Sequence, residues 1–205
     1  GTFNMHEIVL YAQSGNTHNW YGIGVSLILV GMLFKVAAAP FHFWAPDVYQ
    51  GAPTVITMLM STLVKVAAMA TLYKLMDMLI INLQEYQRLI IVVISILTMT
   101  VENITAIWQN NLKRLMAYSG ISHAGFMLMS VLTLHQDAQI LLYYVSAYAL
   151  SGITAFAVII AVCHAKNSQD ISMFRGLGRK HPFMATMLTF SLLSMAGIPI
   201  FSGFW

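Results

Sequence analysis

The chain has 205 residues, of which 59% are hydrophobic and only 8% are charged, and its net charge is +3. Soluble domains carry about 25% charged residues, so the composition excludes an ordinary soluble domain, and so small a charge argues against nucleic-acid binding. The single cysteine, Cys163, excludes a disulfide within the chain and a metal site built from several cysteines.

Residues 1–20 are polar enough to form a connecting segment outside the membrane. The remainder, 21–205, shows no linker or change of composition, and we interpret it as one transmembrane domain. A spanning helix needs about 20 mostly apolar residues, and six segments meet this requirement: 21–44, 53–76, 89–108, 115–134, 138–164 and 183–205. Runs of this length do not fit the short alternating strands of a membrane barrel. The predicted fold class is therefore all-α, a polytopic membrane helix bundle, and we expect the chain to continue beyond both ends.

The first and last segments each contain a proline close to aromatic residues. Pro40 lies in AAAPFHFW and Pro199 in AGIPIFSGFW. Proline removes a backbone donor and interrupts a helix, so we predict helix breaks at both positions. Interrupted segments at corresponding places are typical of transporters built from inverted repeats.

The basic residues of the loops predict an orientation. One set of alternating loops contributes two lysine or arginine residues, Lys74 and Arg88. The opposite set, residues 45–52, 109–114 and 165–182, contributes six: Lys113, Arg114, Lys166, Arg175, Arg179 and Lys180. The positive-inside rule places this second set in the cytoplasm.

Two lysines and a histidine lie near the middle of their apolar segments: Lys35 in the first, Lys65 in the second and His123 in the fourth. A charge at the bilayer centre costs at least about 2.5 kcal/mol, and a mid-segment lysine is too deep to reach the interface along its own stem. Because burial and a neighbouring like charge make a lysine easier to deprotonate, we predict a proton relay in which Lys65 lies beside Lys35. His123 is either a third relay group or a packing residue. Glu102, nearer the cytoplasmic end of its segment, fits an interfacial carboxylate slightly better than a relay group.

Hydroxyl groups near these residues are candidates for holding water in the relay: Ser61, Tyr118, Ser119 and Ser122. We find no nucleotide-binding motif and no iron–sulfur spacing. We therefore expect no cofactor and no metal site in this chain.

Three stretches resemble the antiporter-like, proton-translocating membrane subunits of respiratory complex I: FKVAAAPFHFWAPDVYQGAP, NNLKRLMAYSGISHAGFML and MAGIPIFSGFW. Tyr49 within PDVYQGAP, and lysine rather than histidine at position 65, favour the subunit N branch of NADH-quinone oxidoreductase. The resemblance implies a fold of fourteen helices with two five-helix inverted repeats, of which this chain would supply helices seven to twelve.

The resemblance also assigns site residues. The central lysines of the family correspond to Lys35 and Lys65, and its helix-ten motif corresponds to Tyr118, Ser119, Ser122 and His123. Two residues depart from the family pattern, Ile200 in place of a second proline and Glu102 in place of a small residue. The family's glutamate on helix five and lysine on helix twelve lie outside the chain.

The implied function is proton translocation by a non-redox subunit of an NADH:quinone oxidoreductase. NADH, FMN, iron–sulfur clusters and quinone would be bound by other subunits. The implied partners are other membrane subunits, lipid and protons, in the bacterial inner membrane or an equivalent energy-coupling membrane. Three alternatives remain open at this stage: a subunit of a cation/proton antiporter or membrane-bound hydrogenase, a haem-binding electron carrier using His123 and His164, and a structural scaffold.

Overall fold

The computed structural model describes residues 3–14, 19–79, 85–133, 138–201 and 203. The helices in chain order are α1 (Met5–Gln13), α2 (Asn19–Val36), α3 (Trp44–Gly51), α4 (Thr54–Leu59), η1 (Met60–Val64), α5 (Lys65–Leu79), α6 (Glu85–Ile107), α7 (Leu112–Met129), η2 (Ser130–Thr133), α8 (Ala138–Lys166), η3 (Ile171–Phe174), α9 (Leu177–Lys180) and α10 (Pro182–Met195). Within these described ranges there is no β-strand, so the predicted all-α class is confirmed.

Four of the described helical spans are long and apolar enough to cross a membrane: Thr54–Leu79, Glu85–Ile107, Leu112–Leu132 and Gln139–Lys166. Two shorter apolar helices, Trp20–Val36 and Pro182–Met195, lie where the first and last segments were expected. Their shortness is the main difference from the sequence prediction, because both end well before the predicted boundaries. Residues 1–20 include α1, which Asn4 caps by accepting a hydrogen bond from the His6 backbone N–H at 3.0 Å.

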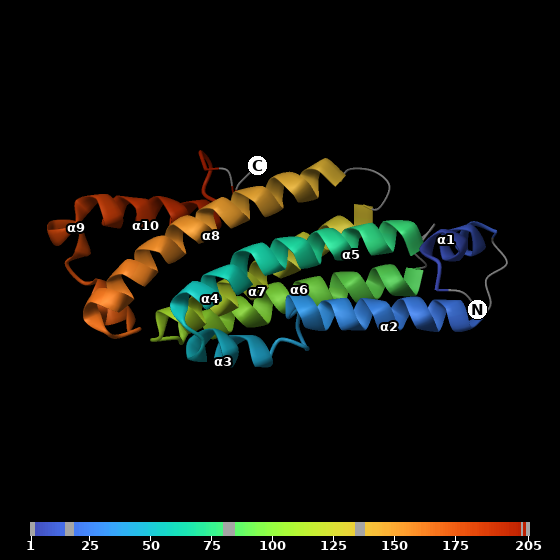
Figure 1. The fold of residues 1–205 in the computed structure, drawn as a ribbon, viewed down its shortest axis with the longest axis horizontal. Helices are drawn as coiled ribbons and strands as arrows, with labels where there is room; N and C mark the ends of the chain where they lie inside the picture. Colours follow the sequence, from blue (N-terminus) through green and yellow to red (C-terminus); the bar gives the residue numbers. More distant parts are fainter. Residues whose placement is uncertain (1–2, 15–18, 80–84, 134–137, 202, 204–205) are drawn as a thin grey trace.

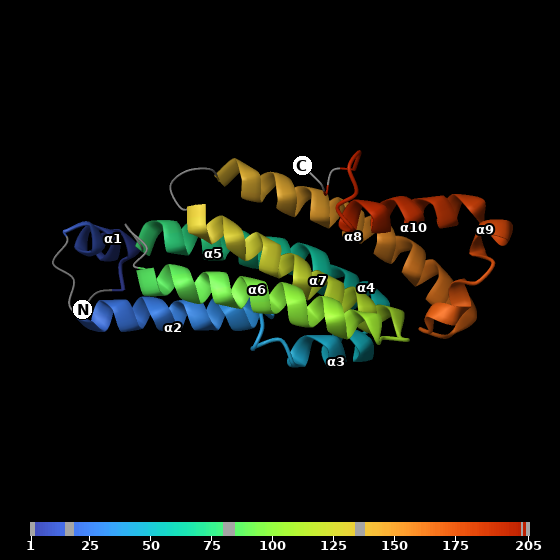
Figure 2. The ribbon, with the colours of Figure 1, turned by 180° about the vertical axis from the view of Figure 1, so that it is seen from behind.

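The long helices run side by side along the long axis of the molecule, as Figure 1 shows. Helices α2, α5, α6 and α7 form one bundle, α8 crosses it obliquely, and α10 packs against α8 (Figure 2). Large apolar residues fill the bundle interior: Leu33, Met69, Leu72, Met76, Ile91 and Leu128. Helices that bond their own backbone groups and meet through such contacts are the expected solution in lipid.

Helix α2 ends at a left-handed residue rather than at the proline itself. Ala37 has φ 60°, and its N–H donates to Phe34 O at 3.1 Å while the Ala38 N–H donates to Leu33 O at 2.9 Å. This pair of bonds is a Schellman motif, which satisfies the last carbonyls of a helix, and a proline commonly follows it. Pro40 lies three residues beyond Ala37, in the segment that leads to α3.

Helix α10 ends in the same way. Gly197 has φ 70°, its N–H donates to Ser194 O at 3.1 Å, and the Ile198 N–H donates to Leu193 O at 3.3 Å. Pro199 again follows. Since α2 and α10 run in opposite directions along the long axis (Figure 1), the two interrupted helices have an inverted relationship.

The span Thr54–Leu79 is interrupted near its middle by η1, a π-helical turn over Met60–Val64. Single π-helical turns within α-helices occur frequently at functional sites. Lys65 is the first residue after this turn.

Candidate functional site

Lys65 is the buried cation at the centre of the bundle. Its side chain is 5% exposed, and its Nζ donates to the backbone carbonyl of Gly120 on α7 at 2.5 Å. A Cβ atom at position 120 would lie 3.1 Å from Lys65 Nζ and 2.9 Å from Tyr148 Oη. Glycine at this position therefore leaves room for the amine and for a phenol beside it.

Tyr148, on α8, also reaches position 120. Its phenol donates to the carbonyl of Ser61 in the π-helical turn at 3.0 Å. The Ser61 hydroxyl donates to Met58 O at 3.1 Å, so its side chain bonds along its own helix. The π-helical turn, Lys65 and Tyr148 thus form one local structure around Gly120.

His123 extends this structure away from Lys65. Its ring centroid is 5.0 Å from that of Tyr148, and its Nδ1 lies 2.8 Å from Tyr144 Oη. His123 and Lys65 are also close enough to interact electrostatically. A small cavity of about 10 Å³ adjoins the ring and is lined by His123, Tyr144, Tyr148, Ser151, Ser194, Met195 and Gly203. This volume is about that of one water molecule. Lys65, Tyr148, His123 and Tyr144 thus form a line of buried or half-buried polar groups, the polar line, which ends at this cavity beside the end of α10.

Glu102 is not an interfacial carboxylate. Its side chain is fully buried, and Oε1 lies 3.3 Å from His42 Nε2. The sequence interpretation was wrong because residues 37–43, the segment between α2 and α3, fold over this part of α6 and cover it. Glu102 is also close enough to Lys65 for the two groups to interact electrostatically, whereas the sequence predicts Lys35 as the charged neighbour of Lys65.

Lys35 has an exposed side chain in the last turn of α2. The prediction that it lies mid-helix assumed a helix reaching residue 44, whereas α2 ends at Val36. A cation in the last turn of a helix is favoured by the helix dipole.

The remaining predicted residues lie at different depths. Ser122 is 4% exposed and Ser119 is half-buried, both on α7. Tyr118 is buried, and it bonds to Arg114 and packs against Ala45 and Tyr49 of α3.

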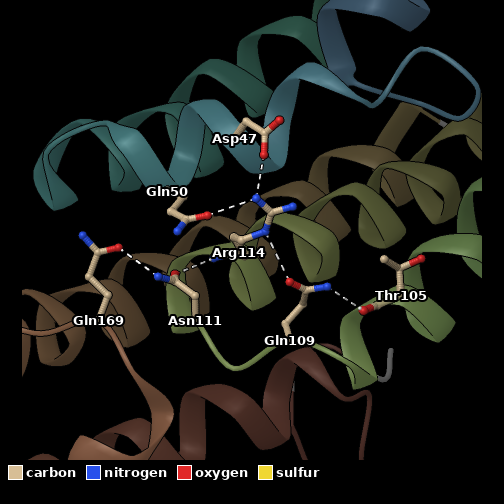
Figure 3. A network of polar contacts seen from close by, with 7 residues as sticks. All are labelled: Asp47, Gln50, Thr105, Gln109, Asn111, Arg114 and Gln169. Carbon is tan, nitrogen blue, oxygen red and sulfur yellow. Dashed lines mark hydrogen bonds and ion pairs between the residues drawn. The ribbon is translucent and has the colours of Figure 1, made fainter.

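A polar cluster lies at the end of the molecule that carries the basic loops. Figure 3 draws its members, Asp47, Gln50, Thr105, Gln109, Asn111, Arg114 and Gln169. Arg114 Nη1 lies 2.6 Å from Asp47 Oδ1 and donates to Gln50 Oε1 at 3.0 Å, and Arg114 Nε donates to Gln109 Oε1 at 3.3 Å. The guanidinium thereby ties α3 to the loop between α6 and α7.

Lys113 is one of the six basic loop residues that predict the orientation, and its side chain is 1% exposed. Its Nζ donates to the carbonyl of Ala52 at 2.7 Å, at the end of α3. Together with Arg114, this contact fixes α3 against the start of α7.

His123 and His164 are not brought together. His164 lies near the end of α8 and lines a separate cavity of about 280 Å³ with Thr54, Val55, Ile160, Cys163, Asn167, Ser168 and Gln169. Across the described ranges, no group of three His, Cys, Asp or Glu side chains is placed to hold a metal ion.

Several functional candidates were missed from the sequence: His42, Gly120, Tyr144 and Tyr148. Tyr144, Tyr148 and Ser151 are spaced like one face of a helix within an apolar segment. Ser95, Thr98 and Glu102 repeat that spacing on α6. A polar stripe at spacings of three and four was the available signal.

The fold and the buried polar line define a class of protein, the polytopic helical membrane proteins with ionisable groups in their interior. The chain belongs to the NADH:quinone oxidoreductase/Mrp antiporter transmembrane family, whose model matches residues 1–205. The family recognised in the sequence is thus confirmed.

Curated relatives agree with the subunit N branch. The chain is 54% identical over 212 residues to NADH-quinone oxidoreductase subunit N of Flavobacterium johnsoniae, covering 100% of this chain and 46% of the relative. It is 43% identical over 206 residues to subunit N of Cytophaga hutchinsonii, again covering all of this chain and 45% of the relative. The chain therefore spans about half the length of these relatives.

Solved structures share the fold. A chain of respiratory complex I from Thermus thermophilus, solved with bound aureothin, is 35% identical with a TM-score of 0.79, covering 98% of this chain and 47% of that one. A chain of an archaeal membrane-bound sulfane sulfur reductase is 27% identical with a TM-score of 0.77, covering 89% and 38%. A chain of the Mrp complex from Dietzia is similar in fold, with a TM-score of 0.76 at 22% identity, covering 98% and 40%.

Proposed function

We propose that this chain is part of a proton-translocating membrane subunit of an NADH-quinone oxidoreductase. The names of its curated relatives support this assignment. The redox chemistry takes place in other subunits, which bind NADH, FMN, iron–sulfur clusters and quinone. Energy released there moves protons through the helices of this chain.

The observation that carries the proposal is the buried amine of Lys65. Its hydrogen bond to Gly120 O leaves it next to the Tyr148 phenol, and Tyr148 adjoins the His123 ring. Ionisable groups inside a membrane bundle are the usual stations of a proton relay. A proton released by Lys65 passes through this line to Tyr144 and the adjoining water-sized cavity.

Lys35 has a different role in this proposal. Its exposed side chain at the end of α2 pairs with an acidic group from the part of the subunit outside residues 1–205. The length of the relatives, about twice that of this chain, supports the existence of such a part.

Lipid and neighbouring membrane subunits cover the outside of the bundle. Most of the exposed side chains along the middle of α6 are large and apolar: Leu89, Ile90, Val93, Ile96, Leu97, Val101 and Ile104. The membrane is the bacterial inner membrane or its equivalent, with residues 45–52, 109–114 and 165–182 in the cytoplasm. Single cysteines at exposed positions of these loops should react with an impermeant reagent only after the inner face is opened. Reaction from the outside would show that the orientation is the opposite of the one proposed.

The test of the relay uses the assembled complex in sealed vesicles. Lys65→Ala should sharply reduce acidification of the vesicles while the amount of assembled complex is unchanged. Lys65→Arg should also impair it, because arginine does not deprotonate in this range. The matched controls are Lys74→Ala and Lys74→Arg, since Lys74 lies on the same helix with its side chain exposed.

Full pumping by Lys65→Arg would contradict the relay and would favour a purely structural role for Lys65, as one member of an ion pair. A second candidate function, cation/proton exchange, is favoured by the family description, which includes the Mrp antiporter. Sodium movement that depends on Lys65 and proceeds without NADH would support that function instead.

A further inference from the structure

A row of buried polar side chains follows one face of α6. Ser95 is 1% exposed, and Thr98 and Glu102 are fully buried. Spacings of three and four residues place them above one another on the same side of the helix. The opposite side of α6 carries the exposed apolar residues described above, so the polar row faces the protein interior.

This row faces the interrupted segment between α2 and α3. The Ala39 backbone N–H donates to Thr98 Oγ1 at 3.0 Å, which fixes the segment to α6. One turn further along α6, Glu102 Oε1 lies 3.3 Å from His42 Nε2. The acid and the imidazole therefore meet where the backbone of α2 has left its helix.

The polar atoms here are buried but incompletely bonded. Apart from the Glu102–His42 contact, both Glu102 oxygens, His42 Nδ1 and Ser95 Oγ have no hydrogen-bond partner among the described residues. A buried polar atom left unpaired costs about 1–3 kcal/mol, and a charged one costs more. Water or a bound proton relieves this cost, so the site is one that holds either.

Lys65 is the charged neighbour of this pair. Lys65 and Glu102 interact electrostatically, yet the two are not in direct contact, because the Glu102 ion pair within 4.0 Å is with His42 and the Lys65 amine bonds to Gly120 O. Because no direct bond joins the two groups, proton transfer between Glu102 and Lys65 requires a bridging water.

The pair also has a definite position along the bundle. Glu102 lies in the last two turns of α6, toward the loop at 109–114, whereas Lys65 lies near the middle of its own span. A proton that enters from the basic loops reaches Glu102 before it reaches Lys65.

We propose that Glu102, with His42 beside it, is a proton-carrying carboxyl group that charges Lys65 from the side of the basic loops. The proposal rests on the proposed function and adds a residue to it. In the transfer step the O–H bond of the Glu102 carboxylic acid breaks and an N–H bond forms on the neutral Lys65 amine through bridging water. The products are a carboxylate and an ammonium, and the carboxylate takes its next proton from water at the loop end.

The experiment compares two substitutions in the assembled complex in sealed vesicles. Glu102→Gln keeps the size of the side chain and removes the exchangeable carboxyl proton, and we expect loss of NADH-driven acidification at unchanged complex content. Glu102→Asp keeps the carboxyl group and should restore part of the activity. Glu85→Gln is the matched control, because Glu85 is an exposed carboxylate on the same helix. It should pump like the unmodified complex.

A second measurement uses the unsubstituted complex and does not depend on the variants folding. An apolar carbodiimide reacts with protonated carboxyl groups in membrane interiors, and mass spectrometry should find the adduct on Glu102 together with loss of pumping. Full pumping by Glu102→Gln, or absence of the adduct at Glu102, would overturn the proposal. The proposed function would survive either result provided that Lys65→Ala still abolishes pumping, so the two failures are distinguishable.

Discussion

Gly120→Ala is the substitution that tests the centre of the site most directly. The added methyl would lie 2.9 Å from Tyr148 Oη and 3.1 Å from Lys65 Nζ, whereas ordinary van der Waals contacts begin at 3.4 Å. The phenol must therefore retreat by about half an ångström and the amine by a few tenths. Those movements lengthen the bond of Tyr148 to Ser61 O and disturb that of Lys65 to Gly120 O.

The expected stability change in Gly120→Ala is small, because two effects oppose each other. Overpacking a buried site costs roughly 1–3 kcal/mol, while alanine in place of glycine within a helix gains about 1 kcal/mol. Proton transfer is more sensitive to this substitution than stability is, since moving both groups increases the distance between Lys65 Nζ and Tyr148 Oη. We expect the variant to assemble and to pump protons poorly. Its free energy of unfolding should lie within about 2 kcal/mol of that of the parent.

The assay is vesicle acidification per assembled complex, alongside thermal unfolding in detergent. Gly24→Ala is the control, because a Cβ at Gly24 meets nothing within 4 Å. Tyr148→Phe combined with Gly120→Ala removes the closest contact and should relieve the packing strain without restoring pumping. Normal pumping by Gly120→Ala alone would refute the claim that the amine and the phenol work at this spacing.

Three further predictions concern the framework, each read by thermal unfolding of the detergent-solubilised subunit. Ala37→Val should destabilise by roughly 1–3 kcal/mol, because a β-branched residue is strained at φ 60°, while Ala37→Gly stays near the parent; equal stability of the two variants would contradict the left-handed helix end. Gly125→Ala should destabilise the protein by roughly 1–3 kcal/mol, because its methyl would lie 2.8 Å from Met99 Cγ and 3.1 Å from a backbone oxygen of α6. An unchanged melting temperature would mean that α6 and α7 are further apart than this structure places them. Arg114→Lys should cost less than about 1 kcal/mol, since its partner Asp47 is largely exposed, and a loss of several times that amount would show a stronger tie than the geometry indicates.

The approximate positions of the helices follow from the sequence, because a long apolar run has few alternatives in lipid. Each such run must satisfy its own backbone, so its length and composition are sufficient to predict a helix. The ends of the interrupted helices were less predictable. The prolines lie within a few residues of the helix ends. However, α2 and α10 both end earlier, just before the left-handed residues Ala37 and Gly197.

The burial of Lys65 was also predictable, since a lysine in the middle of a span cannot reach water along its stem. Its neighbours were not. Glu102, His42 and Tyr148 lie on three other parts of the chain, and which of them meets the amine depends on how each helix is rotated about its axis and on how residues 37–43 fold over α6.

Hydropathy does not reveal such rotations in a membrane protein, because the lipid outside the bundle is as apolar as the core within it. The sequence by itself therefore determined that this chain is a bundle of membrane helices with a cation at its centre. Only the tertiary structure decided that Lys35 lies in the last turn of its helix rather than in the middle of it, and that Glu102 is buried beside His42. The polar neighbours of the buried lysine come from parts of the chain that are far apart in sequence. A local sequence pattern therefore does not specify these contacts.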